Sequence, residues 1–193
     1  MKKLALAAAA LTLAGCGIND VPEKSNTVEA SWSEVQNQYQ RRADLIPNLV
    51  RTVEGFADQE REVLTGVVEA RAKASSIQLD ASDLTDPAKV AQFQAAQEQL
   101  SGALSRLLVT VERYPELKSN ENFLALQSQL EGTENRIAVA RQDYIQTVKN
   151  YNREFMVLPD RWVAAIFNGD YEKAAVFEAP PAAQSAPEVS FGE

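Results

Sequence analysis

The sequence contains no histidine, and its only cysteine is Cys16. A single cysteine cannot form an internal disulfide, and the lack of histidine excludes histidine metal ligands and catalytic Cys–His pairs. The sequence also has no Gly-rich phosphate-binding loop, no G-x-S-x-G string and no nucleophile paired with a base. We therefore predict that the protein is not an enzyme and binds no cofactor.

Positive charge is scarce as well. The chain has 19 Lys and Arg residues against 27 Asp and Glu residues, which gives a formal net charge of −8. Strong acidity argues against binding to nucleic acid and against electrostatic attachment to anionic lipid. We expect no nucleic-acid partner, and any membrane attachment has to come from something other than charge.

The N-terminal residues explain the lone cysteine. Lys2 and Lys3 precede an apolar run over residues 4–14, which is shorter than the roughly 20 residues of a transmembrane helix. A basic head, a short apolar run and small residues are typical of a secretory signal peptide. The string LAGC at residues 13–16 resembles a bacterial lipobox, in which the cysteine is lipidated, the chain is cut before it, and the new amine is acylated.

We accordingly predict a signal peptide over residues 1–15 and lipidation of Cys16. One acyl chain anchors a protein only marginally, whereas three would hold it on a membrane. The protein would then sit in the cell envelope and face away from the cytoplasm. Gly17 stands where an aspartate would indicate inner-membrane retention, which favours the outer membrane. The alternative is an ordinary secretory peptide with an incidental cysteine.

Apolar residues recur at steps of three and four over most of the remaining chain, which is the spacing of packed helices. Strand-like alternation is nearly absent. The apolar stripes extend to residue 74, from 87 to 114 and from 120 to 158, and connections as short as 75–86 and 115–119 require antiparallel neighbours. We predict an all-α fold, a long antiparallel up-and-down bundle of three long helices.

Two features of this bundle stay open. Pro47 either kinks the first long helix or begins a new one capped by Asp44, which would give four long helices. Residues 160–169 form a short amphipathic helix, which either packs over the bundle or lies on a membrane surface.

The chain divides into four predicted parts. Asn26 or Thr27 is expected to cap the first helix. A proline- and alanine-rich C-terminal tail is expected to be extended and largely disordered. The four parts are the signal peptide 1–15, a polar tether 16–26, the bundle 27–169 and the tail 170–193.

Two glutamates, Glu60 and Glu134, fall in the apolar stripes. Di-iron bundles combine such glutamates with Glu-x-x-His pairs, which this chain cannot complete, and no EF-hand spacing is present, so we predict no metal site. Reflecting the helices through the connections 75–86 and 115–119 places Glu60 near residue 102 and Glu134 near residue 100, so both glutamates lie at one level of the bundle. Two stacked carboxylates would repel each other, so we predict a buried Glu–Arg layer that fixes helix register. The alternative places them at a wet edge. The arginines expected nearby are Arg106, Arg136 and Arg141.

Several strings resemble the LemA family of bacterial envelope proteins. They are "RRADLIPNL", "YPELK" and "LEGTENRI", which occur in family order within a resemblance that covers roughly residues 30–158. The resemblance implies a helical bundle held at a membrane and facing away from the cytoplasm. The family has no established enzymatic activity, ligand or catalytic residue, so it implies no site residues here. Many relatives have an N-terminal transmembrane helix where this chain has the lipobox.

These observations favour a non-enzymatic envelope lipoprotein, a helical scaffold that contacts the membrane through Cys16 and other envelope proteins through its surface. The sequence does not identify those proteins. The alternative is a ligand-binding or enzymatic lipoprotein with a pocket inside the bundle, which close heptad packing disfavours.

Overall fold

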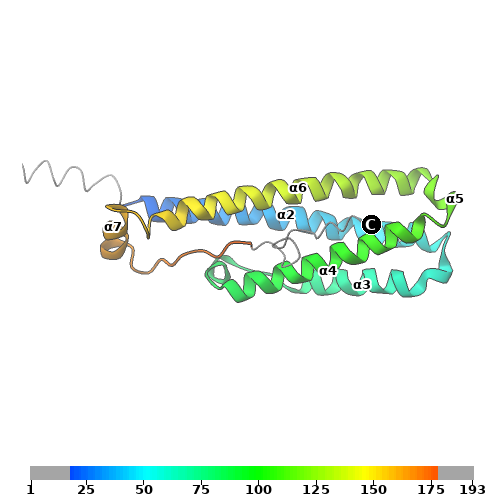
Figure 1. The fold of residues 1–193 in the computed structure, drawn as a ribbon, viewed down its shortest axis with the longest axis horizontal. Coiled ribbons are helices and arrows are strands. Elements are labelled where there is room, and N and C mark those ends of the chain that lie inside the picture. Colours follow the sequence, from blue (N-terminus) through cyan, green and yellow to red (C-terminus); the bar gives the residue numbers. More distant parts are fainter. Residues whose placement is uncertain (1–17, 178–193) are drawn as a thin grey trace, which may run out of the picture.

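The protein is a long helical bundle in the computed structural model, which describes residues 18–177 (Figure 1). The predicted signal peptide, Cys16 and residues 178–193 lie outside this range. No strand occurs among the described residues, so the predicted all-α fold is confirmed. The helices are α2 (Asp20–Glu54), α3 (Arg61–Ser76), α4 (Pro87–Val111), α5 (Pro115–Lys118), α6 (Glu121–Arg153) and α7 (Asp160–Phe167), with short 3-10 turns η1 (Asp58–Glu60) and η2 (Ala81–Thr85).

The four long helices alternate in direction along the bundle (Figure 1). Helices α2 and α6 pack against each other along their length, α3 pairs with α4, and α2 also contacts α3. Contacts between α4 and α6 are sparse, and that side of the bundle is the most open. The antiparallel up-and-down architecture agrees with the prediction.

The first long helix is not broken at Pro47. Helix α2 continues through this residue to Glu54. A proline has no N–H to offer the carbonyl four residues earlier, which leaves the Ala43 oxygen without its helical donor. The Nε of Arg71, from α3, donates to that oxygen at 2.7 Å. A side chain from another helix thus supplies the missing hydrogen bond, and α2 stays intact.

The chain reverses instead at residues 55–60, which gives four long helices. The predicted apolar stripe that extends to residue 74 as one helix is therefore wrong across this turn. The N–H of Ala57 donates to the Val53 carbonyl at 2.9 Å and closes the last turn of α2, while Phe56 is exposed. The intervals of three and four residues between apolar positions continue across the turn only by coincidence.

Helix α2 also begins earlier than predicted. It starts at Asp20, so much of the expected tether is helical, and Asn26 and Thr27 lie inside the helix instead of capping it. Pro22 falls in the first turn, where its missing N–H interrupts little of the helical ladder. The apolar side chains that bring this turn into the bundle are Val21 and Val28, both buried.

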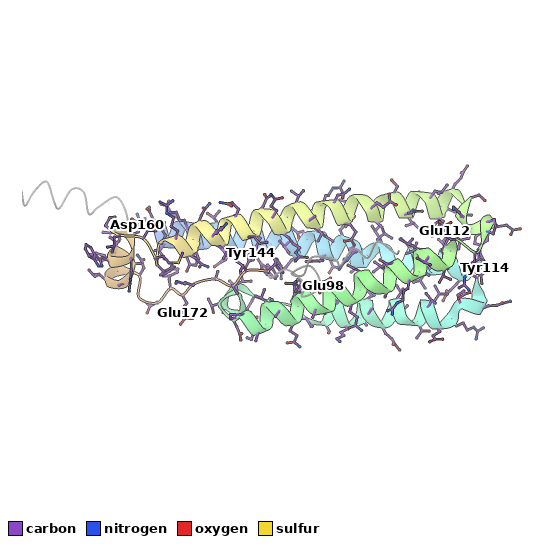
Figure 2. All side chains as sticks on the ribbon, in the orientation of Figure 1. Glu98, Glu112, Tyr114, Tyr144, Asp160 and Glu172 are labelled. Carbon is purple, nitrogen blue, oxygen red and sulfur yellow. The ribbon has the colours of Figure 1, made fainter. Side chains whose placement is uncertain are left out.

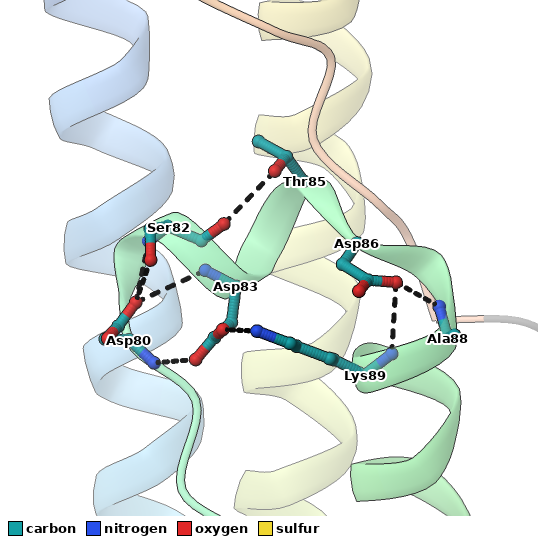
Figure 3. Close-up of polar contacts among 7 residues, drawn as sticks. All are labelled: Asp80, Ser82, Asp83, Thr85, Asp86, Ala88 and Lys89. Carbon is teal, nitrogen blue, oxygen red and sulfur yellow. Dashed lines mark hydrogen bonds and ion pairs between the residues drawn. The ribbon is translucent and has the colours of Figure 1, made fainter.

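The connection between α3 and α4 is shaped by carboxylates (Figure 3). The Oδ1 of Asp80 accepts hydrogen bonds from the backbone and hydroxyl of Ser82, and the Asp83 carboxylate accepts from the Asp80 N–H. The bonds that the Asp80 carboxylate accepts, from the Ser82 hydroxyl first and then from the Ser82 and Asp83 N–H groups, hold the pKa of Asp80 below its ordinary value. Asp86 accepts from the Ala88 N–H at 2.9 Å and caps α4 directly before Pro87.

The core consists of two clusters, one in each half of the bundle. We call the half that contains the start of α2 and the end of α6 the aromatic half, and the half that contains η1 and α5 the aliphatic half. Figure 2 marks the two with Tyr144 in the first and Tyr114 in the second. The aromatic half is built on Trp32, Tyr39, Phe93, Tyr144, Tyr151 and Phe177. The aliphatic half is built on Ile46, Leu49, Val53, Leu64, Val67, Leu100, Leu104, Leu107, Val111 and Leu130.

Residues 170–177 form no helix, as predicted for the tail, but they are packed on the bundle, which corrects the expectation of disorder for this part. The Asn152 side chain holds both backbone groups of Ala174, at 2.9 and 2.8 Å. The N–H of Ala175 donates to the Leu84 carbonyl at 2.7 Å. The segment therefore ties α6 to η2.

Candidate functional site

The most elaborate polar site in the described chain surrounds Arg42, a residue of α2 with 1% exposure. Its Nη1 donates to Ser101 Oγ at 2.8 Å and to Glu134 Oε1 at 2.9 Å. Its Nη2 donates to the side-chain and backbone oxygens of Gln97, at 2.6 and 3.2 Å. One guanidinium group thus joins α2 to α4 and α6. We call Arg42, Gln97, Ser101 and Glu134 the arginine layer.

The arginine layer also reaches α3. The amide nitrogen of Gln97 donates to the Ala74 carbonyl at 3.3 Å. All four long helices are consequently linked at this level. A planar donor with five N–H groups suits this role, because it can satisfy acceptors on several helices at fixed angles.

The charges of the arginine layer are unevenly buried. The Glu134 side chain is 44% exposed, so the carboxylate is partly hydrated while the arginine is not. The Arg42 guanidinium also lies 5.0 Å from the centre of the Tyr39 ring. Burial raises the pKa of the Tyr39 hydroxyl, and the positive charges of Arg141 and Arg42 oppose that rise. Within residues 18–177, Arg42 Nε has no hydrogen-bond partner.

The arginine layer lies at the boundary between the two halves of the core. On α2 it follows Tyr39 of the aromatic half and precedes Ile46 of the aliphatic half. On α6, Glu134 lies between Ile137 and Leu130 in the same way. A charged layer between two apolar clusters resists sliding of the helices, since a shift of one turn would place Arg42 in either cluster without partners.

Only part of the predicted glutamate–arginine layer is present. Glu134 pairs with a buried arginine, but its own side chain is 44% exposed and so lies at the wet edge that was the alternative. Glu134 does form a buried-arginine contact next to residue 100, the level expected for it. Glu60 lies elsewhere, near the end of the aliphatic half, where its Oε1 accepts from Arg113 Nη2 at 3.0 Å and from the Tyr114 hydroxyl at 2.9 Å. The two glutamates therefore share no level.

The register error has a physical cause in the connection after α3. Arg71 bonds to the Ala43 carbonyl, and Gln36 Nε2 donates to the Leu79 carbonyl at 2.9 Å. The chain thus continues along α2 past the end of α3 before it turns at η2. This continuation shifts every α3 residue relative to α4, and reflection through the middle of the connection could not show it.

None of the three arginines expected in the layer occupies it. Arg106 and Arg136 are exposed, and Arg141 lies over the Phe177 ring, with 4.7 Å between its guanidinium carbon and the ring centre. No role was predicted for Arg42, although its position in the sequence indicates that it is buried. It continues the three- and four-residue steps through Val35, Tyr39 and Ile46, so a charged residue falls on the buried stripe of α2.

The aromatic half contains two tyrosines whose hydroxyls are tied to the C-terminal segment. Tyr144 donates to the Ala175 carbonyl at 3.0 Å, and Tyr151 donates to the Glu172 carbonyl at 2.7 Å. Burial raises the pKa of Tyr144 well above its ordinary value and that of Tyr151 from 10.0 to about 12. Both hydroxyls therefore stay protonated at neutral pH and act as hydrogen-bond donors.

Two hollows flank the arginine layer. One, of about 210 Å³, is lined by residues that include Tyr39, Phe93 and Gln97. The other is a groove of about 500 Å³ on the open side between α4 and α6, with Leu104, Leu130 and Glu134 on its walls. Ligand pockets usually have volumes of about 300–1,000 Å³, so the groove is large enough for a small ligand and the first hollow is below that range.

The described residues offer no group of three acidic or cysteine side chains placed to hold a metal ion. None of the helices in that part of the chain combines the length and the apolar character that crossing a bilayer requires. The predicted lipidation site, Cys16, is not among the described residues. Ile18, the first of them, lies beside α7, since Asn168 Nδ2 donates to its carbonyl at 3.1 Å.

Comparison with known proteins gives a family match over most of the chain. The model of the LemA family matches residues 31–191. This range includes the four long helices almost entirely, and also α7 and the C-terminal segment.

Three curated proteins are similar at low identity. "Magnetosome protein MamQ 2" and "Magnetosome protein MamQ 1" of Paramagnetospirillum magneticum are each 25% identical over 174 residues, which cover 82% of this chain and 63% of theirs. "Protein LemA" of Metamycoplasma hominis is 22% identical over 161 residues, which cover 83% of this chain and 68% of that protein. The chain thus spans less than two thirds of the length of the two magnetosome proteins.

Proposed function

The chain belongs to the LemA family, and on that premise we propose that it is a lipid-anchored protein of the bacterial cell envelope that acts as a helical scaffold and not as an enzyme. The anchor is the acylated Cys16, and the bundle faces away from the cytoplasm. The outer membrane is the favoured location, because Gly17 replaces the aspartate that would indicate retention in the inner membrane.

One observation carries the anchor. The only cysteine of the chain stands at the end of the string LAGC, directly after a short apolar run. It also precedes Ile18, the first described residue, by two positions. A fully extended chain covers about 3.3–3.6 Å per residue, so the chain between Cys16 and Ile18 can span at most about 7 Å. The lipid would hold the Ile18 end of the bundle close to the membrane.

The scaffold role is supported by how the buried polar groups are used. The arginine layer and the hydroxyls of Tyr144 and Tyr151 join helices and the C-terminal segment to one another. Groups engaged in this way set the shape of the bundle, and they are not free to act on a substrate. The surface of the bundle would then be the part that meets other envelope proteins.

The anchor is tested by mass spectrometry of the protein purified from native membranes. We expect a mature N-terminal peptide that begins with a triacylated Cys16. The matched variant, Cys16→Ser, should remain uncleaved or appear in the soluble fraction. A native chain with a free Cys16 thiol, or one that is cut elsewhere, would contradict the anchor.

The scaffold role is tested by crosslinking in the native membrane followed by affinity capture of the lipidated protein. We expect wild type to recover a reproducible set of envelope proteins. We expect variants on one surface of the bundle to lose that set. Recovery of no reproducible protein at native abundance would contradict an interaction scaffold.

The alternative, a ligand-binding or enzymatic lipoprotein, would use the groove between α4 and α6, which has the volume of a small-ligand site. A ligand bound there would raise the unfolding midpoint in a metabolite screen. The substitution Leu104→Gln, on the groove wall, should abolish such a shift if the groove is the site.

A further inference from the structure

Helix α7 leaves an apolar surface uncovered at the end of the aromatic half. The helix buries Ala164 against the bundle, while Trp162 and Ile166, on the opposite side, are 63% and 72% exposed. They lie one helical turn apart and therefore share a face. Figure 2 shows side chains of this helix projecting away from the end of the bundle. We call the exposed apolar residues here the end patch; they are Met156, Leu158, Trp162, Ile166 and Phe167.

The end patch lies beside the start of α2. The carbonyl of Ile18 precedes the N-cap Asn19 and is not part of the helical ladder of α2. The Asn168 side chain donates to that carbonyl at 3.1 Å, and Asn168 itself is buried. Lys24 of α2 also pairs with the buried Glu154, which follows α6. The end patch is thus fixed beside Ile18, the first described residue.

We propose that the end patch rests on the surface of the lipid bilayer and orients the bundle with its α7 end against the membrane. This inference rests on the proposed anchor at Cys16, because acyl chains on that residue would enter the bilayer within about 7 Å of Ile18. Exposed tryptophan and aliphatic side chains on a short amphipathic helix suit the boundary between headgroups and acyl chains.

The charges around the end patch indicate how it binds. Asp160, Asp170 and Glu172 outnumber Arg161 and Lys173 in and after α7. This end of the bundle is therefore not attracted to anionic lipid, and burial of apolar side chains has to drive the contact. We accordingly expect the contact to form equally well on neutral and on anionic bilayers, and only when the acyl chains keep the bundle at the surface.

The two tryptophans of the chain allow a direct test, because Trp32 is buried and Trp162 is exposed. The lipidated full-length protein is reconstituted in phosphatidylcholine vesicles with brominated acyl chains, which quench nearby tryptophan fluorescence. We expect wild type to lose emission by about twofold relative to unbrominated vesicles, since Trp162 reaches the acyl boundary. Trp162→Phe, which keeps only Trp32, should show no such loss.

Two exposed positions of equal accessibility provide matched variants. Ile166→Asp, in the end patch, should abolish the bromine quenching while the protein still floats with the vesicles through its lipid. Val109→Asp, on α4 and also at a 72% exposed position, should leave the quenching unchanged. Both variants change a solvated residue, so their unfolding midpoints should match that of wild type.

The outcomes separate this inference from the anchor. A protein that floats with the vesicles but shows no bromine quenching would overturn the membrane contact and leave the anchor standing. Acrylamide in the buffer reports whether Trp162 is open to water. If Trp162 is quenched neither by acrylamide nor by bromine, a second copy or another segment covers the end patch, and the membrane contact is also overturned. If Cys16 carries no lipid, the anchor fails, and the membrane contact that rests on it is overturned as well.

Discussion

The aromatic half and the aliphatic half of the bundle are closed in different ways. In the aliphatic half, leucine, valine and alanine side chains from the helices fill the core. In the aromatic half the helices enclose large rings, and a non-helical segment completes the packing: Phe177 lies 5.8 Å from the Trp32 ring and 5.4 Å from the Tyr144 ring, between ring centres.

This difference shows which half depends on distant parts of the chain. The aliphatic core needs only the heptad pattern of its helices. The aromatic core needs carbonyl groups for its hydroxyls and a fifth apolar element, and residues 170–177 supply both. We expect the aromatic half to be the one that a change at the C-terminus disrupts, and the arginine layer to limit how far the disruption extends.

The largest effect is expected from removing the C-terminal segment. Phe177→Ala alone should lower the free energy of unfolding by about 3–5 kcal/mol, because it leaves a cavity beside the Trp32 and Tyr144 rings. Truncation after Gly169 should cost at least as much, since Tyr144 and Tyr151 also lose their acceptors. Urea denaturation followed by circular dichroism measures both changes.

The matched control is deletion of residues 180–193, which lie outside the described residues and whose composition predicts little buried surface. This shorter truncation should shift the thermal midpoint by less than about 4 °C, which corresponds to roughly 1 kcal/mol for a domain of this size. A larger shift would show that the packed segment extends further than residue 177.

Removing the acceptor in the arginine layer should have the next largest effect. Glu134→Ala leaves the buried Arg42 charge with only neutral partners, and the loss of a hydrogen bond to a charged group costs about 1.5–3 kcal/mol. Equilibrium denaturation should detect this loss in both halves together, because the layer joins their cores. Two separate unfolding transitions would instead show that each half unfolds by itself.

The double variant Arg42→Met with Glu134→Leu separates the contribution of the arginine layer to stability from its role in fixing the register of the helices. Replacing a buried ion pair with apolar residues of similar volume is often neutral or stabilising. We expect this variant to be at least as stable as Glu134→Ala, and to show broader amide resonances by NMR if the helices now sample shifted registers. Sharp spectra identical to those of wild type would contradict the register role.

A smaller effect is expected for Glu60. Its partner Arg113 is 64% exposed, so the pair is largely hydrated and an exposed pair contributes at most about 1 kcal/mol. Glu60→Ala should therefore cost about 1 kcal/mol or less by the same denaturation assay. A cost as large as that of Glu134→Ala would show that the turn at η1 is as important to the bundle as the arginine layer.

The smallest effect at neutral pH is expected for Tyr151 in the aromatic half, because its contribution to the free energy of unfolding changes only at alkaline pH. Burial raises the pKa of Tyr151 to about 12 in the folded state, against 10.0 when it is unfolded. The unfolded chain therefore loses this proton first, so stability is complete below about pH 10 and falls as the pH rises toward 12. Ultraviolet absorbance should show one tyrosinate step near pH 12 that Tyr151→Phe removes. A step near pH 10 for Tyr151 would contradict its burial.

Periodicity alone was enough to predict the helical class and the antiparallel order, because heptad steps follow directly from helix packing. It could not locate the turn at residues 55–60, where the steps continue across a reversal. The order of residues 170–177 was missed for a related reason. Its partners, Asn152, Tyr144 and Leu84, are distant in sequence, and composition describes only what a segment can bury by itself.

The candidate site shows the same limit. Glu134 could be placed near residue 100 because α4 and α6 are joined by a short, symmetric connection. Glu60 could not, because the chain continues along α2 after Ser76 before it turns. Arg42 was visible as a charge on a buried stripe. Its four acceptor oxygens, on Gln97, Ser101 and Glu134, come from two other helices, and only the structure brings them together.

Pro47 of α2 has a consequence for how the molecule assembles. An α-helix normally keeps its inner carbonyls occupied, so a neighbouring element finds no backbone acceptor on it. Pro47 releases one, the Ala43 oxygen, and Arg71 of α3 binds it. The proline thus fixes the point along α2 at which α3 docks. Alanine at this position would make α2 a better helix and would at the same time remove the acceptor that Arg71 binds.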